Sequence, residues 1–197
     1  MSPAGRQVVI TTERTVLVPL GPPLTEAFAR YQDRNREHFK SSGPLPPTGA
    51  EFLEWARRVT AQAEAEWNDD RGARFVICAS PGHSGEEVGH EVMGHVAFTQ
   101  IARGPFQACY LGFGLDSRAV GCGLMKEALQ RAIRFVFEEL HLHRIMANHV
   151  PTNVRSARTL RGMGFVPEGY ARDYLFIDGA WRDHVLLALT NSLPIRP

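Results

Sequence analysis

The sequence predicts a mixed α/β (α+β) fold that forms one domain around a central sheet. Segments with strand-like and helix-like patterns alternate along the chain without an internal repeat. The segment from Leu124 to Leu140 carries a broad apolar stripe at helical spacing, which is typical of a helix packed on a sheet. An Asp178-Gly179 pair between two apolar runs indicates a β-hairpin. With 197 residues, 44% of them hydrophobic, the chain can bury one sizeable core.

The N-terminal half is expected to hold strands and two helices. Runs rich in Val, Ile, Thr and aromatic residues predict strands at residues 8–18, 75–79, 92–101 and 108–115. Thr25 is a suitable cap for a helix that runs to about Phe39. Thr48 is a suitable cap for a second helix that runs to about Trp67. Gly, Pro and then two glutamates predict an exposed turn at residues 81–87.

The C-terminal half begins with the long helix that follows the glycine-rich loop. In this helix Glu127 is spaced to pair with Arg131 one turn later. Residues 144–150 are expected to form a strand. Asn153 is a suitable N-cap of a short helix that stops at Gly164.

Taking Asp178-Gly179 as a two-residue loop fixes a register for the C-terminal hairpin. This register predicts three cross-strand pairs: Phe176 with Trp181, Tyr174 with Asp183, and Asp173 with His184. The Asp–His pair would lie on one face of the hairpin, and the aromatic residues would lie on the other. A β-bulge would break this register.

The six residues from Arg118 to Gly123 are the clearest functional signal in the chain. They join a strand to the long helix and contain a basic side chain and two glycines, Gly121 and Gly123. Free N–H groups and the helix dipole make a helix start an anion site, and glycine lets the main chain approach the anion. The Walker string and the dinucleotide-binding pattern are both absent. The loop therefore predicts a phosphate or pyrophosphate held by backbone, with an ordinary glycine-rich turn as the alternative.

The pattern Arg-x-x-Gly-x-Gly in this loop resembles the acetyl-CoA pyrophosphate loop of the GNAT N-acetyltransferases. Residues 153–165, which open with Asn-x-x-Ser and close with Gly-Phe, resemble the second CoA-binding segment of this superfamily. Residues 170–184 resemble ribosomal-protein-alanine N-acetyltransferases of the RimJ type, within a likeness that spans about residues 106–190. The resemblance implies a GNAT fold with a mixed, mostly antiparallel sheet of about seven strands and about four helices. The sheet would be splayed at the acetyl-CoA site.

Acetyl-CoA, as co-substrate, is the cofactor that this resemblance implies. Backbone groups of Phe113, Gly114 and Leu115 would hold its pantetheine arm, and a backbone N–H there would meet the developing oxyanion. The cofactor-binding residues implied in full are Phe113, Gly114, Leu115, Arg118, Ala119, Val120, Gly121, Cys122, Gly123, Leu124, Asn148, Asn153 and Ser156.

The resemblance also suggests which side chains move protons. Many relatives place a tyrosine acid seven residues after the position of Asn153, where this chain has Leu160. Ser156 corresponds to a serine that RimL-like enzymes are thought to use near the thiol, so it is the candidate acid. The alternative for Ser156 is a first-turn residue that only satisfies the backbone or CoA. Asn148 stands where some relatives carry a glutamate base, but an amide cannot accept the proton.

Asp173 is the candidate base, with Glu168 and His184 as alternatives. An Asp173–His184 pair could tune either group, but the interpretation that we favour for such a pair is an ordinary structural ion pair. Substrate contacts are expected from His38 in the segment 38–45, and from Tyr174 and Trp181. The aromatic side chains could instead pack on the sheet or on a partner subunit.

Three functions are compatible with these residues. The leading one is acetylation of the N-terminal α-amine of a protein, with a ribosomal protein that begins with Ala or Ser as the implied substrate. An α-amino group has a pKa of about 7.7–8.0 against about 10.4 for lysine, so it needs little deprotonation. The alternatives are acetylation of a small amine on the same scaffold and a non-catalytic acyl-CoA-binding sensor.

Composition and charge limit the classes of partner and the cellular location that we expect. A net charge of +1 gives no reason to expect direct nucleic-acid binding. Three widely spaced cysteines suit a reduced compartment, and no apolar run is long enough for a membrane span or signal segment, so a cytoplasmic location is expected. The eight histidines show no ligand spacing, so no metal is predicted. The chain is expected to be a monomer or a homodimer.

Overall fold

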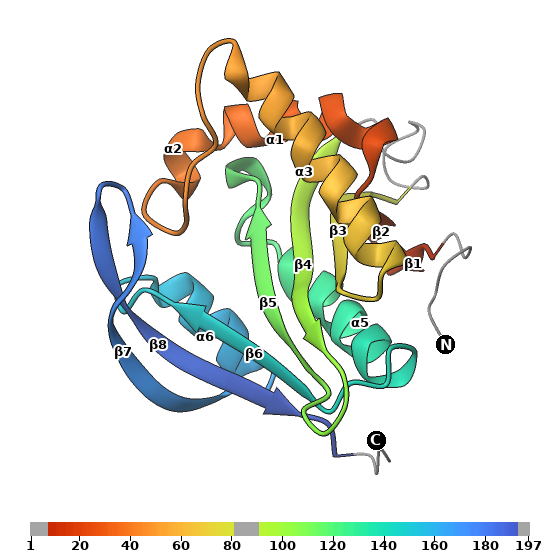
Figure 1. Ribbon diagram of the computed structural model, residues 1–197, viewed down its shortest axis with the longest axis vertical. Coiled ribbons are helices and arrows are strands. Elements are labelled where there is room, and N and C mark those ends of the chain that lie inside the picture. Colours follow the sequence, from red (N-terminus) through yellow and green to blue (C-terminus); the bar gives the residue numbers. More distant parts are fainter. Residues whose placement is uncertain (1–7, 81–90, 193–197) are drawn as a thin grey trace.

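The computed structural model describes residues 8–80 and 91–192, so the turn predicted at residues 81–87 lies outside the described residues. The described residues form one eight-stranded sheet in the order β1-β2-β3-β4-β5-β6-β8-β7 (Figure 1). The strands are β1 (Ile10–Thr11), β2 (Thr15–Pro19), β3 (Gly72–Ala79), β4 (Val92–Ala102), β5 (Ala108–Leu115), β6 (Arg144–His149), β7 (Val166–Ile177) and β8 (Ala180–Thr190). All neighbouring strands are antiparallel except β5 and β6, which are parallel. The mixed, mostly antiparallel sheet is therefore confirmed.

The strand number exceeds the expectation by one because residues 8–18 form two strands instead of one. A tight turn separates β1 from β2, and in it the Thr12 N–H donates to the Thr15 carbonyl oxygen over 2.8 Å. The hydroxyl groups of these two threonines also lie 2.7 Å apart. The β-branched residues that predicted a long strand here also stabilise the turn that divides it.

The helices are α1 (Thr25–Arg34), α2 (Arg36–Phe39), α3 (Glu51–Asn68), α5 (Leu124–Glu138) and α6 (Val154–Gly162), with 3₁₀ turns η1 (Pro22–Leu24) and η2 (Ser117–Ala119). The first predicted helix is split at Asn35, whose side-chain amide donates to the Tyr31 carbonyl oxygen over 3.0 Å. Thr25 is the first residue of α1, not its cap, and its hydroxyl donates back to Pro22. The cap predicted at Thr48 is also wrong, because α3 begins after Ala50.

Two apolar layers cover the two faces of the sheet. On one face, α5 buries Met125, Ala128, Leu129, Ala132, Ile133 and Val136, which confirms the predicted stripe. On the other face, α1 and α3 pack against β3 and β4 through Phe28, Tyr31 and Ala63. Alternate residues of β3 serve the two layers: Phe75 and Ile77 belong to the α5 side, and Val76 and Cys78 to the α1 side. This packing fixes the start of α5 against the sheet.

The parallel strands β5 and β6 separate half-way along β5. Their pairing runs from Ala108 with Arg144 to Leu111 with Ala147 and then stops. Beyond it, among the described residues, residues 112–115 of β5 pair only with β4, and the end of β6 pairs only with β8. In Figure 1 the two strands diverge toward the end at which α5 begins. The splay expected for this fold is therefore present.

The C-terminal hairpin confirms the predicted turn but not all of the predicted register. Asp178 and Gly179 both have positive φ, 48° and 73°, and Phe176 lies opposite Trp181. A bulge then shifts the register between Ala171 and Leu175. As a result, His184 lies opposite Ala171 instead of Asp173, and the pairs predicted for Tyr174 and Asp173 are wrong.

The carboxylate of Asp183 holds the bulge. One of its oxygens accepts the Asp173 N–H over 2.9 Å, and the other accepts the Tyr170 hydroxyl over 2.7 Å. Asp173 has a φ of 45°, a conformation that a side chain rarely adopts. A local hydrogen-bond acceptor thus stabilises an irregularity that hydrophobic alternation cannot reveal.

We expect Asp183→Ala to loosen this bulge, because the Asp173 amide then loses its acceptor. Hydrogen exchange measured by NMR should accelerate at Asp173 and Tyr170 and stay unchanged in β4 and β5. Asp183→Asn, which keeps an oxygen in place, is the matched control. If the Asp173 amide is equally protected in the alanine variant, other contacts hold the bulge.

Candidate functional site

The glycine-rich loop leaves β5, passes through η2 and enters α5. Gly121 and Gly123 have φ values of +88° and +78°, so both positions require the freedom that glycine has. Gly123 is the N-cap of α5, and it contributes no side chain that would cover the free N–H groups of the first turn. A Cβ atom added at Gly121 would meet no atom within 4 Å. The main chain is therefore exposed where the anion was predicted.

The buried side chain of Asp116 anchors this loop at the end of β5. The side chain is 2% exposed and accepts the Arg118 N–H over 3.0 Å, so it caps η2. From α1, Arg34 donates to the same carboxylate over 2.5 Å and Asn35 donates to it over 3.1 Å. The side-chain oxygen of Asn35, Oδ1, in turn accepts the Ser117 N–H over 2.9 Å. The end of α1 thus holds the first turn of the loop at the Ser117 amide and at the Asp116 carboxylate.

These contacts keep Asp116 ionised. Burial by itself would raise its pKa, but hydrogen bonds from Arg118, Arg34 and Asn35 outweigh burial and hold the pKa well below the ordinary value of 3.8. Arg34 also donates to the Val92 carbonyl oxygen at the start of β4. The ion pair of Arg34 with Asp116 therefore joins α1, β4 and the loop throughout the neutral pH range.

The Arg118 side chain is engaged with protein carboxylates. Its guanidinium donates to Asp116 over 3.1 Å and to Glu91 over 2.6 Å, although the side chain is 62% exposed. Two neighbouring carboxylates compensate most of its charge. The main-chain amides of the loop are then the groups best placed to hold an anion, and a direct contact from the Arg118 guanidinium stays a prediction.

A second brace reaches the loop from the N-terminal hairpin. Arg14 donates to the Cys122 carbonyl oxygen over 2.9 Å and forms an ion pair with Glu127 over 2.7 Å. The backbone N–H of Arg14 also donates to Glu127 over 2.8 Å. The predicted pair of Glu127 with Arg131 is therefore wrong, because a residue far away in the sequence occupies the carboxylate.

The second predicted segment lies where β6 ends and α6 begins. Asn153 is confirmed as the N-cap of α6: its side-chain oxygen accepts the Ser156 N–H over 3.0 Å. The Asn153 amide also donates to the hydroxyl of Ser42, in the loop after α2, over 3.3 Å. Asn148 is the first residue of β6 beyond its last pair with β5. Asn148, Asn153 and Ser156 are thus gathered on the β6 side of the splay.

The predicted substrate residues lie on both sides of β5. His38 stands at the end of α2, next to Phe39, and burial, followed by the charge of Arg155, lowers its pKa. On the other side of β5, burial, followed by the nearby Tyr110 of β5, raises the pKa of Tyr174 on β7. Figure 1 shows α1 to α3 on one side of the splayed end of β5 and the β7–β8 hairpin on the other.

The remaining candidates are dispersed along the hairpin. Trp181 is 61% exposed near the turn, where it contacts Phe176 edge to face. Asp173 is exposed in the bulge, whereas His184 is buried and its Nδ1 contacts the Arg182 carbonyl oxygen over 2.9 Å. Glu168 forms an ion pair with Arg144, at the end of β6 opposite to the splay. Of the three candidate bases, Glu168 is therefore the one that the structure separates from the site.

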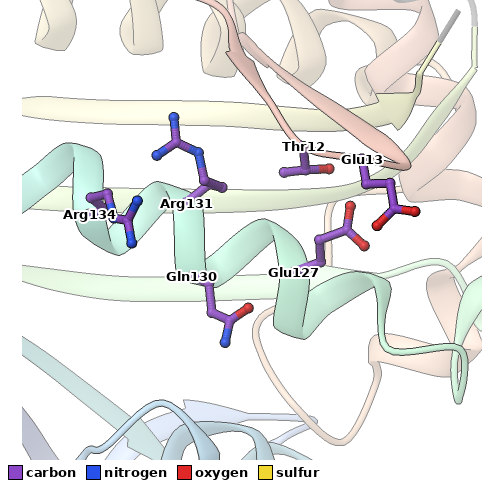
Figure 2. A pocket seen from close by; sticks show the side chains of 6 residues that line it. All are labelled: Thr12, Glu13, Glu127, Gln130, Arg131 and Arg134. Carbon is purple, nitrogen blue, oxygen red and sulfur yellow. The ribbon is translucent and has the colours of Figure 1, made fainter.

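A pocket of about 490 Å³ lies elsewhere on the molecule. Figure 2 shows it between α5 and the β1–β2 turn. It is lined by Thr12, Glu13, Glu127, Gln130, Arg131 and Arg134. None of these is a predicted site residue, and the lining residues of α5 follow the helix from Glu127 to Arg134, so the pocket is a separate feature from the exposed main chain of the glycine-rich loop.

Residues 8–80 and 91–192 contain neither a metal site nor a helix that could span a membrane. These residues contain no group of three or more His, Cys, Asp or Glu side chains arranged to bind a metal ion. Every helix in this part of the chain is too short or too polar to cross a membrane.

Sequence reasoning missed the supports of the loop. Asp116 had a local signal, since an aspartate between a strand and a Ser-Arg step is a common cap. The contributions of Arg34, Asn35 and Arg14 had no such signal, because these residues lie 81 to 113 positions away from their partners.

Comparisons with known proteins agree with this geometry. Residues 14–166 match a family model described as an acetyltransferase (GNAT) domain. The ribosomal protein uS5-alanine N-acetyltransferase of Escherichia coli strain K12 is 54% identical over 101 residues, which cover 51% of this chain and 52% of that protein. The matched region is thus about half the length of that curated relative.

Two solved structures cover nearly the whole chain. Ribosomal-protein-S5-alanine acetyltransferase from Vibrio fischeri has a TM-score of 0.85 at 31% identity, over 96% of this chain and 100% of that chain. RimJ of Mycobacterium smegmatis in complex with CoA-disulfide has a TM-score of 0.82 at 26% identity, over 94% and 88% of the two chains.

We expect Gly121→Val to weaken CoA binding, because a side chain at this positive φ strains the loop and fills the space above it. A left-handed conformation costs a non-glycine residue about 1–2 kcal/mol, so the Kd measured by calorimetry should rise roughly tenfold. Arg118→Ala should have a smaller, salt-dependent effect.

Gly104→Val is the matched control. Gly104 also has a positive φ, +68°, and open space around it, but it lies between β4 and β5 at the far end of the sheet. Gly104→Val should lose stability through the same strain at a positive φ as Gly121→Val does, but it should keep the CoA affinity of the wild type. Equal affinity in folded Gly121→Val would contradict the assignment of the loop.

We expect Asp116→Asn to lower the free energy of unfolding by roughly 1–3 kcal/mol, since buried donors lose a charged acceptor. The pKa of Asp116 is depressed in the folded state, so its contribution is complete above 3.8 and is lost as the pH falls through the lower, folded-state pKa. Denaturant unfolding should therefore show a constant gap between wild type and variant from about pH 5 to 9. A gap that changes within this range would contradict the assignment.

Proposed function

This chain belongs to the GNAT acetyltransferase family, and from that premise we propose that it transfers acetyl from acetyl-CoA to the N-terminal α-amine of a protein. The preferred acceptor is a ribosomal protein that begins with Ala or Ser. Two relatives named as ribosomal-protein-alanine acetyltransferases support this class of substrate. One of them is matched over its full length at 31% identity.

The observation that carries the proposal is that three features meet at one place. The β5–β6 gap, the exposed main chain at Gly121 and the first turn of α6 all lie at the same end of the sheet. The β6-facing edge of residues 112–115 has no strand partner in the part of the chain that the structure describes, so its N–H and C=O groups are available to an extended ligand. Added Cβ atoms at Gly112 and Gly121 would meet no atom within 4 Å, which leaves room for a ligand against the backbone.

These residues fit acetyl-CoA. Bound there, the co-substrate supplies an activated acetyl group as a thioester. The loop amides from Val120 to Gly123, with the start of α5 at Leu124, hold its diphosphate. The Arg118 and Ala119 N–H groups shape the loop instead, because both already donate to Asp116. Main-chain groups of Phe113, Gly114 and Leu115 hold the pantetheine arm in the gap. The chain contributes positioning above all, which is worth several kcal/mol in a two-substrate reaction.

The acceptor enters from the face that carries His38 and Tyr174. An N-terminal α-amine is partly neutral at pH 7–8, with a pKa of about 7.7–8.0, so a weak base or water is enough to remove its proton. Ser156, in the first turn of α6, is our candidate for the proton donor to the thiolate. The position at which many relatives place a tyrosine is Leu160, which is fully buried in the core. Asp173, exposed in the bulge, is the candidate base.

The test is an acceptor panel. Wild-type protein with acetyl-CoA is mixed with peptides that begin with Ala, Ser or Pro, with N-terminally blocked versions, and with small amines, and free thiol release is measured. We expect release with the Ala and Ser peptides and none with their blocked versions, because the α-amine is the nucleophile. Intact mass analysis should place the acetyl group on the N-terminus.

Two results would contradict the proposal. Release with small amines alone would point to a small-molecule acetyltransferase. Tight CoA binding without turnover on any acceptor would point to an acyl-CoA-binding sensor.

A further inference from the structure

His95, on β4, lies directly over Gly114, one of the residues proposed to hold the pantetheine arm. The two residues are paired across β4 and β5. A Cβ atom added at Gly114 would lie 2.6 Å from His95 Cε1 and 3.2 Å from the Phe39 ring. Edge-to-face contacts with Tyr31 and Phe39 hold the imidazole at centroid distances of 5.9 and 6.1 Å. The position of the ring over the backbone of β5 is thus tightly defined.

The two nitrogens of the ring have different surroundings. Nδ1 lies 3.0 Å from the hydroxyl of Tyr31, a side chain with no exposed surface. Nε2 has no hydrogen-bond partner in the part of the chain that the structure describes. Every side-chain nitrogen or oxygen with essentially no exposed surface among the described residues does have a partner, so Nε2 keeps some exposed surface. On the imidazole ring it lies on the other side of Cε1 from Nδ1, and the ring is on the face of the sheet that Tyr31 and Phe39 cover.

The contact with Tyr31 selects one tautomer. Among the described residues, His95 Nδ1 is the hydrogen-bond partner of the Tyr31 hydroxyl. If Nδ1 carried the proton, it would donate to the phenolic oxygen, and the buried O–H would have no acceptor. Leaving such a group unsatisfied costs about 1–3 kcal/mol. Tyr31 therefore donates to Nδ1, and the neutral ring carries its proton on Nε2.

The surroundings also keep the ring neutral. Burial, followed by the charge of Arg74 on β3, lowers the pKa of His95 to about 4. The α1 side presents Tyr31 and Arg34, and the guanidinium of Arg34 lies 5.7 Å from the centre of the Tyr31 ring. Arg34 is paired with Asp116, and burial holds the pKa of Tyr31 well above its ordinary value. On the α2 side, His38 is separated from His95 by Phe39.

We propose that His95 is a further catalytic residue, whose Nε2–H donates a hydrogen bond to the thioester carbonyl oxygen as that oxygen gains charge. This inference rests on the proposed function. Attack by the amine nitrogen forms the C–N bond and moves the C=O π electrons onto oxygen. Collapse restores the C=O bond and breaks the C–S bond, and its electron pair leaves on sulfur. Overall, one proton passes from nitrogen to sulfur, and His95 neither gains nor loses one.

A donor of this kind would supplement the backbone amides of β5. The loss of one oxyanion donor lowers kcat by about 10²–10³ in other acyl-transfer enzymes. We therefore expect His95→Leu to lower kcat at least tenfold and to leave the CoA Kd unchanged. His95→Gln should retain most of the activity, because its side-chain amide can present an N–H close to the position of Nε2. Thermal unfolding of both variants checks that each is folded.

A spectroscopic readout tests the tautomer without turnover. Long-range ¹H–¹⁵N spectra of the wild-type protein should show His95 neutral and protonated on Nε2 from about pH 5 to 9. Tyr31→Phe should release the preference for this tautomer. Because the ring stays neutral over this pH range in the wild-type protein, the pH profile of its kcat/KM should show no limb that belongs to His95.

Two glycines on β5 provide a matched pair for the same spectra. Gly114→Ala should displace the imidazole, shift its nitrogen resonances and lower kcat, because the new Cβ clashes with Cε1. Gly112→Ala, two residues earlier on the same strand and with open space at Cβ, should leave the His95 resonances in place.

Several results would overturn the inference. These are a proton found on Nδ1, a His95 pKa near 6.5 that coincides with a limb of the pH profile, and full kcat in folded His95→Leu. If the wild-type protein transfers acetyl to no acceptor, the proposed function fails instead, and the spectra still decide the tautomer.

Discussion

The carboxylate of Asp116 is the group on which the site depends. It is buried at the end of β5, where a charged group is costly unless it is fully paired, and it is paired by Arg34, Asn35 and the Arg118 amide. These partners come from α1 and from the loop itself, so satisfying one charge fixes the position of both segments. The direction of the loop, the start of α5 and the main-chain surface at Gly121 all follow from that constraint.

The site also needs an edge of backbone without a strand partner, and among the described residues the splay of β5 and β6 provides it. A parallel pair that continued past Leu111 would satisfy every N–H and C=O group and leave nothing for a ligand. Glycines at 112 and 114 keep the adjoining face free of side chains, except where His95 lies over Gly114. In the proposed site, main-chain groups therefore make most of the contacts to the ligand, and side chains shape the space around it.

Local signals in the sequence were sufficient for much of this arrangement. Gly121 and Gly123, the Asn153 cap, the α5 stripe and the Asp178-Gly179 turn each depend on neighbouring residues, and each was predicted. The errors have a different cause. The partner of Glu127 is 113 positions away, and the break at Asn35 depends on Asp116, 81 positions away. The bulge before Leu175 depends on a side chain across the hairpin. Only the folded chain brings these groups together.

The bulge in β7 also bears on how the molecule avoids self-association. β7 is the outermost strand at one border of the sheet, and most of its residues are exposed, including Val166 and Tyr170. A long, regular strand in that position would offer a template to which other chains could add. The kink around Asp173 interrupts the regular spacing of its donors and acceptors, and at the opposite border β1 is only two residues long. Within the described residues, neither border therefore presents a long, uninterrupted ladder of donors and acceptors to which a neighbouring strand could add.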